Sequence, residues 1–157
     1  MPRSDHANMS SDRLTVGNKD EELDARLDAE LSAFNLATSG VHERTEFTVR
    51  IEDDAADLVA GLSGWTWGTC AGISLVWVRD DRRGQGVGAR LLEAAERVAR
   101  ERGCGQIVVS SFTFQAPGFY ERHGFVETGR IEGLPVEGAA DVQLVKHLPR
   151  PALRSPS

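Results

Sequence analysis

Basic residues are in short supply in this chain of 157 residues, where 18 lysines and arginines face 24 aspartates and glutamates. A formal net charge of −6 argues against a general attraction to nucleic acid or anionic lipid, because both need a basic excess or a clustered basic face. The pair Arg82-Arg83 is the one basic cluster that stands out in the sequence. We therefore expect neither a nucleic-acid partner nor a membrane partner.

Long apolar runs are also missing, and none approaches the roughly 18 residues needed to span a bilayer. The polar N-terminus lacks the apolar segment of a secretory signal. The two cysteines, Cys70 and Cys104, belong to no CxxC motif and have no metal-ligand spacing. Two buried free thiols fit a reducing compartment, so we expect a cytoplasmic protein without a metal site.

The composition that remains is that of an ordinary globular protein, with 40% hydrophobic and 27% charged residues. Residues 1–19 have almost no large apolar side chains and are predicted to form a disordered N-terminal tail. Residues 149–157 contain three prolines and are predicted to form a C-terminal tail. Between these tails we predict a single domain over residues 20–148.

Apolar periodicity within that domain predicts a mixture of helices and strands. An amphipathic helix is expected from Asp20 to just before Gly40, and it is a candidate wall of a substrate pocket. The nearly continuous apolar run 70–78 predicts a central strand covered on both faces. Further helices are expected over 87–102 and 116–123, and further strands over 46–51, 58–62, 106–110, 125–131 and 142–145.

The most informative stretch is the turn Arg82-Arg83-Gly84-Gln85-Gly86-Val87-Gly88, between the run 70–78 and the helix predicted behind it. Glycine adopts positive φ and allows close approach of the backbone, while the first turn of a helix leaves about four N–H donors unpaired. The helix dipole adds roughly half a positive charge at this end. The turn therefore predicts a site for phosphate oxygens, although glycines in a connecting loop also serve turn geometry alone.

Two separated motifs make the chain resemble the GCN5-related N-acetyltransferase (GNAT) family. The first is Arg83-x-x-Gly86-x-Gly88 behind a strand that ends at Val78, and the second is Ala116-x-x-x-Tyr120-x-x-x-Gly124-Phe125. The resemblance covers about residues 45–147. It implies an α/β (mixed α+β) fold with a splayed, mostly antiparallel sheet and helices on both faces.

The resemblance also implies where acetyl coenzyme A would bind as co-substrate. Its pantetheine arm would lie in the splay between the strand that ends at Val78 and the strand around Val108, and pair with backbone groups of Val76 and Val78. The N–H groups from Gly84 to Ala89 would hold the pyrophosphate. The implied cofactor-binding set is Val76, Val78, Arg83, Gly84, Gln85, Gly86, Val87, Gly88 and Ala89.

The implied reaction is acetyl transfer to the amine of a small molecule by direct attack in a ternary complex. Tyr120, the only tyrosine, stands where the family protonates the departing thiolate, and its phenol has an ordinary pKa near 10. The alternative role for Tyr120 is that of a core aromatic. No carboxylate occurs in the run 73–78, so the proton of the amine would leave through water, with Glu43, Glu46 and Asp141 as open candidates.

The acceptor amine and the oligomeric state stay open, although a homodimer is common among such folds. The acidic balance favours a small cationic acceptor, such as a polyamine or an amino sugar.

Three other functions match parts of the sequence. The spacing Gly84-x-Gly86-x-x-Ala89 also fits a dinucleotide-binding turn, but residues 108–112 lack the acid that would hold the ribose. A Walker loop fails because no lysine follows the last glycine. A domain that keeps the cofactor cleft and acts only as a sensor or partner-binding module is the non-enzymatic alternative.

Overall fold

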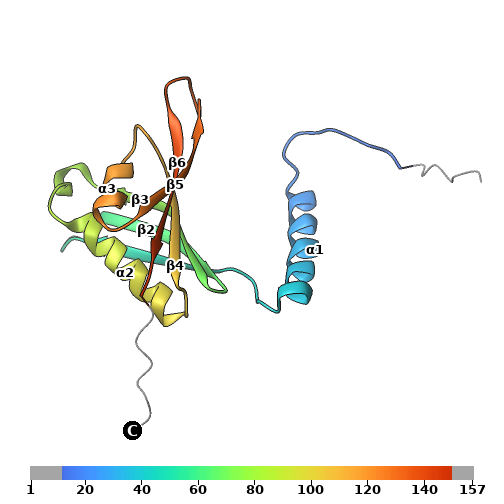
Figure 1. Cartoon of the computed structure of the whole chain (residues 1–157), viewed down its shortest axis with the longest axis horizontal. Coiled ribbons are helices and arrows are strands. Elements are labelled where there is room, and N and C mark those ends of the chain that lie inside the picture. The colour runs from blue at the N-terminus through green and yellow to red at the C-terminus, as the bar shows by residue number, and fades with distance from the viewer. Residues whose placement is uncertain (1–11, 150–157) are drawn as a thin grey trace, which may run out of the picture. The chain divides into compact units, whose positions relative to one another are not determined.

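The computed structural model describes residues 12–149, which fall into two units that meet at the Ser39–Gly40 bond (Figure 1). Residues 12–19 form neither helix nor strand. The parts of the tail predictions that concern residues 1–11 and 150–157 lie outside the described residues. None of the helices within 12–149 is long and apolar enough to cross a bilayer. The elements are α1 (Glu21–Ser39), β1 (Thr45–Glu52), β2 (Leu58–Trp67), β3 (Cys70–Val78), α2 (Val87–Glu101), β4 (Gln106–Phe112), α3 (Pro117–Arg122), β5 (Val126–Glu132) and β6 (Ala140–His147).

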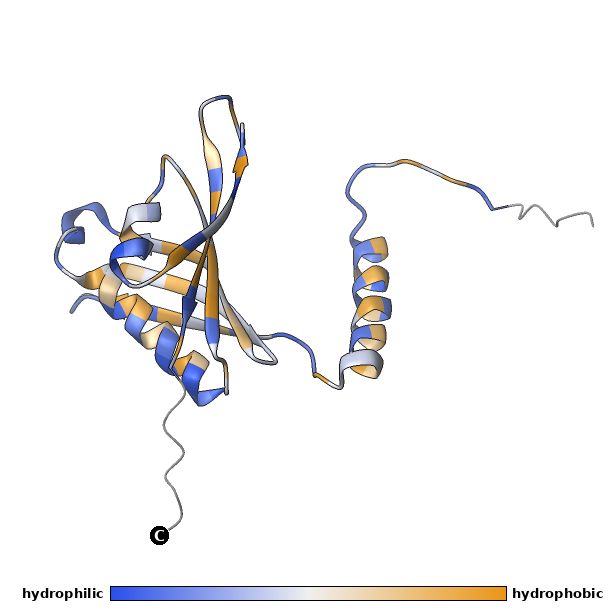
Figure 2. Cartoon of the chain, in the orientation of Figure 1, coloured by the Kyte–Doolittle hydropathy of each residue, from blue (hydrophilic) through white to orange (hydrophobic). Residues whose placement is uncertain are grey.

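The first unit contains α1, which confirms the helix predicted from Asp20. The Asp20 carboxylate accepts a hydrogen bond from the amide of Leu23 (3.0 Å), and acids in the first turn complement the helix dipole. No residue of α1 is buried. Hydrophilic and hydrophobic residues alternate along its ribbon (Figure 2), and the cap and the acids of the first turn are its visible local stabilisation.

The second unit is built on a six-stranded sheet in the order β1-β2-β3-β4-β6-β5. Every neighbouring pair is antiparallel except β3 and β4, which are parallel and joined by α2 as a crossover helix. Only Cys70–Gly72 pairs with Gln106–Val108, so β3 and β4 part beyond this short ladder. The splayed, mostly antiparallel mixed sheet predicted from the sequence is confirmed.

One hydrophobic core lies under α2 and α3. It combines Leu91 and Leu92 of α2 with Tyr120 of α3, and with strand residues such as Ile107 and Leu144. Both helices of this unit thus share one face of the sheet, which we call the helical face, whereas the resemblance implied helices on both faces. The strand residues that alternate away from the core form the second face of the sheet.

The prediction that β3 is covered on both faces is correct only for its first half. Ala71, Gly72 and Ile73 are buried, whereas Leu75 is 72% exposed and Trp77 is 48% exposed. The exposed residues lie where β4 has already diverged, and they alternate onto the second face. An apolar run in the sequence indicates a strand, but it does not show which neighbour covers each face.

Strand β2 runs five residues further than the predicted 58–62, because glycine here permits close packing. A Cβ on Gly64 would lie 2.8 Å from the Phe47 ring, and one on Gly72 would lie 2.2 Å from the Trp65 indole. The register of β2 against β3 shifts at a bulge between Ser63 and Gly64. Glycine at these positions leaves room for large aromatic rings to pack against the strands, and the strands continue through both glycines.

A buried acid on α2 forms an ion pair with β6, which lies beyond β4 in the sheet. Glu96 is 8% exposed, contacts the Lys146 ammonium of β6 and accepts a hydrogen bond from Arg100 (3.3 Å). Removing one member of such a pair leaves the other charge desolvated. We expect Glu96→Gln to lower the free energy of unfolding by about 2 kcal/mol in urea titrations. Glu93→Gln, on the exposed side of the same helix, serves as the control, and equal stability of both variants would contradict the expectation.

Candidate active site

The glycine turn leads directly into α2, as predicted. Gly84 and Gly86 have φ of 73° and 77°, in the left-handed region that other residues rarely adopt. A Cβ on either would meet nothing within 4 Å, so both backbones are open to an approaching group. Gly88 has another role, because a Cβ there would lie 2.9 Å from the Phe119 ring of α3. Two glycines therefore shape the turn, and the third brings α2 close to α3.

The amides of this turn are available for a ligand. The first backbone amide past the turn that bonds within the chain is that of Arg90, which donates to the Gly86 carbonyl (3.2 Å). Within residues 12–149, the amides from Gly84 to Ala89 donate no hydrogen bond to the protein. They lie at the positive end of the α2 dipole. This arrangement can bind an anion through backbone donors alone.

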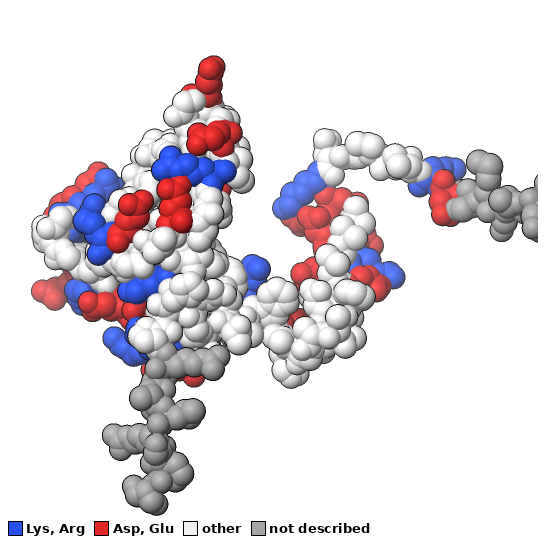
Figure 3. Space-filling model, in the orientation of Figure 1, with Lys and Arg blue, Asp and Glu red and all other residues white. Residues whose placement is uncertain are grey.

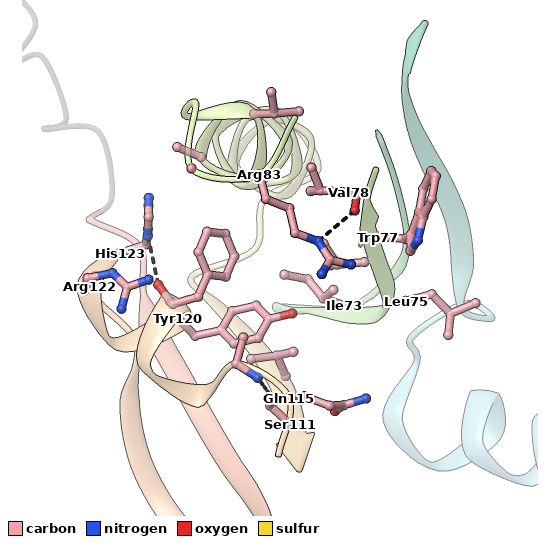
Figure 4. A pocket seen from close by; sticks show the side chains of 18 of the residues that line it. Ile73, Leu75, Trp77, Val78, Arg83, Ser111, Gln115, Tyr120, Arg122 and His123 are labelled. Carbon is pink, nitrogen blue, oxygen red and sulfur yellow. Dashed lines mark hydrogen bonds between the residues drawn. The ribbon is translucent and has the colours of Figure 1, made fainter. Parts of the chain in front are cut away.

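Arg83 braces the turn as well as adding charge to it. Its Nε donates to the Val78 carbonyl (3.1 Å), and its Nη2 lies 2.9 Å from the Asp80 carboxylate. Figure 4 shows the side chain reaching back to the end of β3. Gln85 adds a bond from Nε2 to the Asp81 carbonyl (2.9 Å). The end of β3 and the turn are thus linked by side-chain bonds within the protein.

A pocket of about 760 Å³ joins this turn to the splay, a size typical of small-molecule and cofactor sites. It brings together eight of the nine predicted cofactor-binding residues, all but Gln85, and it includes Tyr120. Arg122 and His123 of the α3 region also line it, and neither was singled out from the sequence. The remaining lining residues are Ile73, Ser74, Leu75, Trp77, Arg82, Val109, Ser110, Ser111, Phe114, Gln115, Ala116 and Phe119.

Tyr120 is both a packed aromatic and a pocket residue. It is 7% exposed, and its ring makes edge contacts with Phe119 and Phe125 at centroid distances of 5.2 and 5.5 Å. Its hydroxyl makes no hydrogen bond with the described residues and points across the pocket toward Ile73 of β3 (Figure 4). Burial raises the pKa of the phenol above its ordinary value. The group therefore stays protonated at neutral pH and can donate a proton.

Polar residues at the end of β4 and in the turn before α3 brace the entry to the helix that carries Tyr120, and sequence reasoning missed this role. The buried Ser111 hydroxyl accepts from the Ala116 amide (3.3 Å) just before α3 begins, and the Gln115 side chain accepts from the Phe112 amide (3.0 Å). Thr113 accepts from the Ala140 amide (3.1 Å). The available signal was a group of small polar residues ahead of Pro117, which is typical of turns that start helices.

The three candidate carboxylates for proton removal lie on different parts of the second unit. Glu43 lies in the exposed segment before β1, and Glu46 lies on β1, two strands away from the splay. Asp141 lies on β6, which pairs directly with β4. Asp141 is thus the nearest of the three in strand order, one strand away from the edge of the splay. Acidic and basic side chains otherwise alternate over the viewed face of this unit (Figure 3).

The two cysteines match the expectation of free thiols. Cys104 is buried and Cys70 is partly buried, and neither forms a disulfide. Burial raises the pKa of both thiols, which keeps them protonated and weakly nucleophilic. Neither cysteine lines the pocket.

Comparison with known proteins finds acetyltransferases both by sequence and by structure. A blasticidin-S acetyltransferase of Streptomyces morookaense is 39% identical over 60% of this chain and 70% of its own length. An acetyltransferase of Agrobacterium fabrum is 32% identical over 71% of this chain and 82% of its own. The crystal structure of an acetyltransferase from Agrobacterium tumefaciens superposes with a TM-score of 0.79 at 29% identity, covering 87% of this chain and 99% of that one.

The profile of the acetyltransferase (GNAT) family matches residues 10–125, which include the glycine turn, the splay and Tyr120. With its mixed splayed sheet and its acetyltransferase relatives, this chain belongs to the GNAT family of acetyltransferases.

Proposed function

We propose that the protein moves the acetyl group of acetyl coenzyme A to the amine of a small molecule within a ternary complex. The observation that carries this proposal is that residues 84–89, all but Gln85, line one pocket with Tyr120, and that their backbone amides donate no hydrogen bond within residues 12–149. The relative named blasticidin-S acetyltransferase favours a small-molecule acceptor over a protein. In this proposal the protein is a cytoplasmic enzyme. Its catalytic domain spans residues 20–148, and it assembles as a homodimer.

The donor would be held at two places. The amides at the start of α2 would bind its pyrophosphate, since they offer convergent donors and a positive dipole. Its pantetheine arm would lie along the free edge of β3 past Gly72, where β4 no longer pairs and where Val76 and Val78 line the pocket. The thioester would then lie near Tyr120, between the two diverging strands.

The chemistry needs one new bond and one broken bond. A neutral amine attacks the thioester carbonyl, the N–C bond forms, and the C–S bond breaks to release the coenzyme A thiolate. The Tyr120 phenol protonates this thiolate, a proton from the amine leaves to water, and the resulting phenolate regains a proton from water. The raised pKa of Tyr120 keeps the proton available, and the hydroxyl faces the pocket, where the sulfur would lie (Figure 4).

The proposal is tested by thiol release from acetyl coenzyme A with a panel of small primary amines. We expect release that depends on the amine and on enzyme concentration, with the acetylated amine identified by mass spectrometry. Tight binding of acetyl coenzyme A without turnover on any amine would favour a sensor instead. No binding of acetyl coenzyme A at all would contradict both functions.

A further inference from the structure

The second face of the sheet carries a carboxylate that the proposed chemistry does not use. Asp141 lies on β6, where Ala140, Val142 and Leu144 alternate into the core. Asp141 and Gln143 therefore face the other side of the sheet. The Gln143 amide donates to the Asp141 carboxylate (3.0 Å), in agreement with two side chains on one face.

Apolar side chains flank this carboxylate on both sides. In the ladder, Asp141 lies opposite Phe112 of β4 and opposite Ile131 of β5. Phe112 stacks on Phe114, with ring centroids 5.3 Å apart and planes 4° from parallel, and Phe114 lines the pocket. Among residues 12–149, no lysine, arginine or histidine forms a salt bridge with Asp141. The charge is thus a half-buried anion beside an aromatic stack.

Across the splay from Asp141, strand β3 also presents apolar side chains on the second face of the sheet. Leu75 and Trp77 alternate away from Val76 and Val78, which pack toward the core, and both line the pocket. Figure 4 shows the two side chains on the side of β3 away from Tyr120. The second face of the splay is thus bordered by apolar surface and by one carboxylate. The pocket's arginines lie elsewhere, in the turn before α2 and on α3.

We propose that Asp141 binds a second cationic group of the acceptor while Trp77 and Phe114 contact its body. This inference rests on the proposed function, because it assumes that the acceptor enters the splay from the second face. Asp141 of β6 pairs with Phe112 of β4, and Phe112 lies two residues after Ser110, which lines the pocket. Strand geometry places it roughly 8 Å from Ser110.

That separation defines both the role of Asp141 and the class of acceptor. Asp141 does not itself line the pocket, and at roughly 8 Å from Ser110 it lies at the border of the site, so we assign it no role as a general base. It can bind a distal ammonium or guanidinium through a charge-assisted hydrogen bond. The acceptor class is therefore a compact amine with a planar or apolar body and a second positive group at its far end. Long polyamines and polycationic amino sugars fit this apolar border less well.

The test compares p-xylylenediamine with benzylamine, which has the same ring and one cation fewer. Binding to the full chain is measured by calorimetry without acetyl coenzyme A. We expect the wild type to bind the diamine roughly tenfold more tightly, and Asp141→Asn to lose this preference. Asp141→Glu should keep it. Asp54→Asn removes the same charge from an exposed turn away from the pocket and should bind like the wild type.

Two results would overturn the inference. One is equal diamine binding by the wild type and Asp141→Asn, and the other is a wild type that does not prefer the diamine. Where turnover is measured, Asp141→Asn should raise KM for the diamine with kcat nearly unchanged, and a fall in kcat at unchanged KM would point to another role. Absence of turnover on every amine would count against the proposed function alone, since this binding test needs no reaction.

Discussion

Replacing Gly86 by glutamate should weaken acetyl coenzyme A binding by at least a hundredfold while the chain stays folded. The position precedes α2, where open amides from Gly84 to Ala89 are proposed to hold the pyrophosphate. A carboxylate there would occupy the phosphate position and repel the phosphates. Because nothing lies within 4 Å of the Cβ site, the cost in folding comes mainly from the positive φ of 77°, about 1–2 kcal/mol. Calorimetric titration and thermal unfolding measure the two effects.

Gly103 provides a matched control at the other end of the same helix. Its φ is 80°, and nothing lies within 4 Å of its Cβ site either. Gly103→Glu should therefore lose similar stability but bind the donor like the wild type. Gly86→Ala should fall between the two, because it has the strain without the charge. Normal donor affinity in Gly86→Glu would remove the glycine turn from the proposed site.

Replacing Tyr120 by phenylalanine should lower kcat by roughly a hundredfold or more with little change in donor affinity. The hydroxyl makes no hydrogen bond within the described residues, so the variant should keep the ring contacts with Phe119 and Phe125 and unfold at a similar temperature. A large loss of rate without a loss of stability would separate the acid role from the packing role. An unchanged kcat would leave Tyr120 as a core aromatic.

The pH dependence gives an independent test of the same proton. The protonated phenol is the active form, and burial raises the pKa of Tyr120 above its ordinary value of 10. Activity that depends on this acid should therefore persist through pH 10 and decline only at higher pH. The remaining activity of Tyr120→Phe should lack this decline. A wild-type decline centred well below pH 10 would show that another group controls the rate.

Local patterns were enough to predict the parts of the site that the chain forms from neighbouring residues. The run 70–78 is β3 to the residue, and the expected start of α2 at Val87 is confirmed, because strand propensity and a glycine turn are both encoded locally. Tyr120 reaches the pocket because its position in a short helix after β4 follows from the spacing around Pro117. The crossover through α2 then fixes which strands are parallel.

Features that depend on contacts between strands or helices far apart in the sequence could not be predicted from local patterns. The exposure of Leu75 and Trp77 follows from where β4 leaves β3, which no residue of the run itself records. Asp141 was an unplaced candidate until the β4–β6 register set it opposite Phe112. Gly88 looked like its two neighbouring glycines in the sequence, but its contact with Phe119 depends on the packing of α2 against α3.

The bonds that brace the glycine turn bear on how fast a donor can be captured. Arg83 and Gln85 fasten the turn to Val78, Asp80 and Asp81, all within the protein itself. The loop is therefore preorganised, and docking a dinucleotide-like tail requires little loss of conformational freedom. Association should then proceed in one kinetic phase, without a slow loop-closing step after the first encounter.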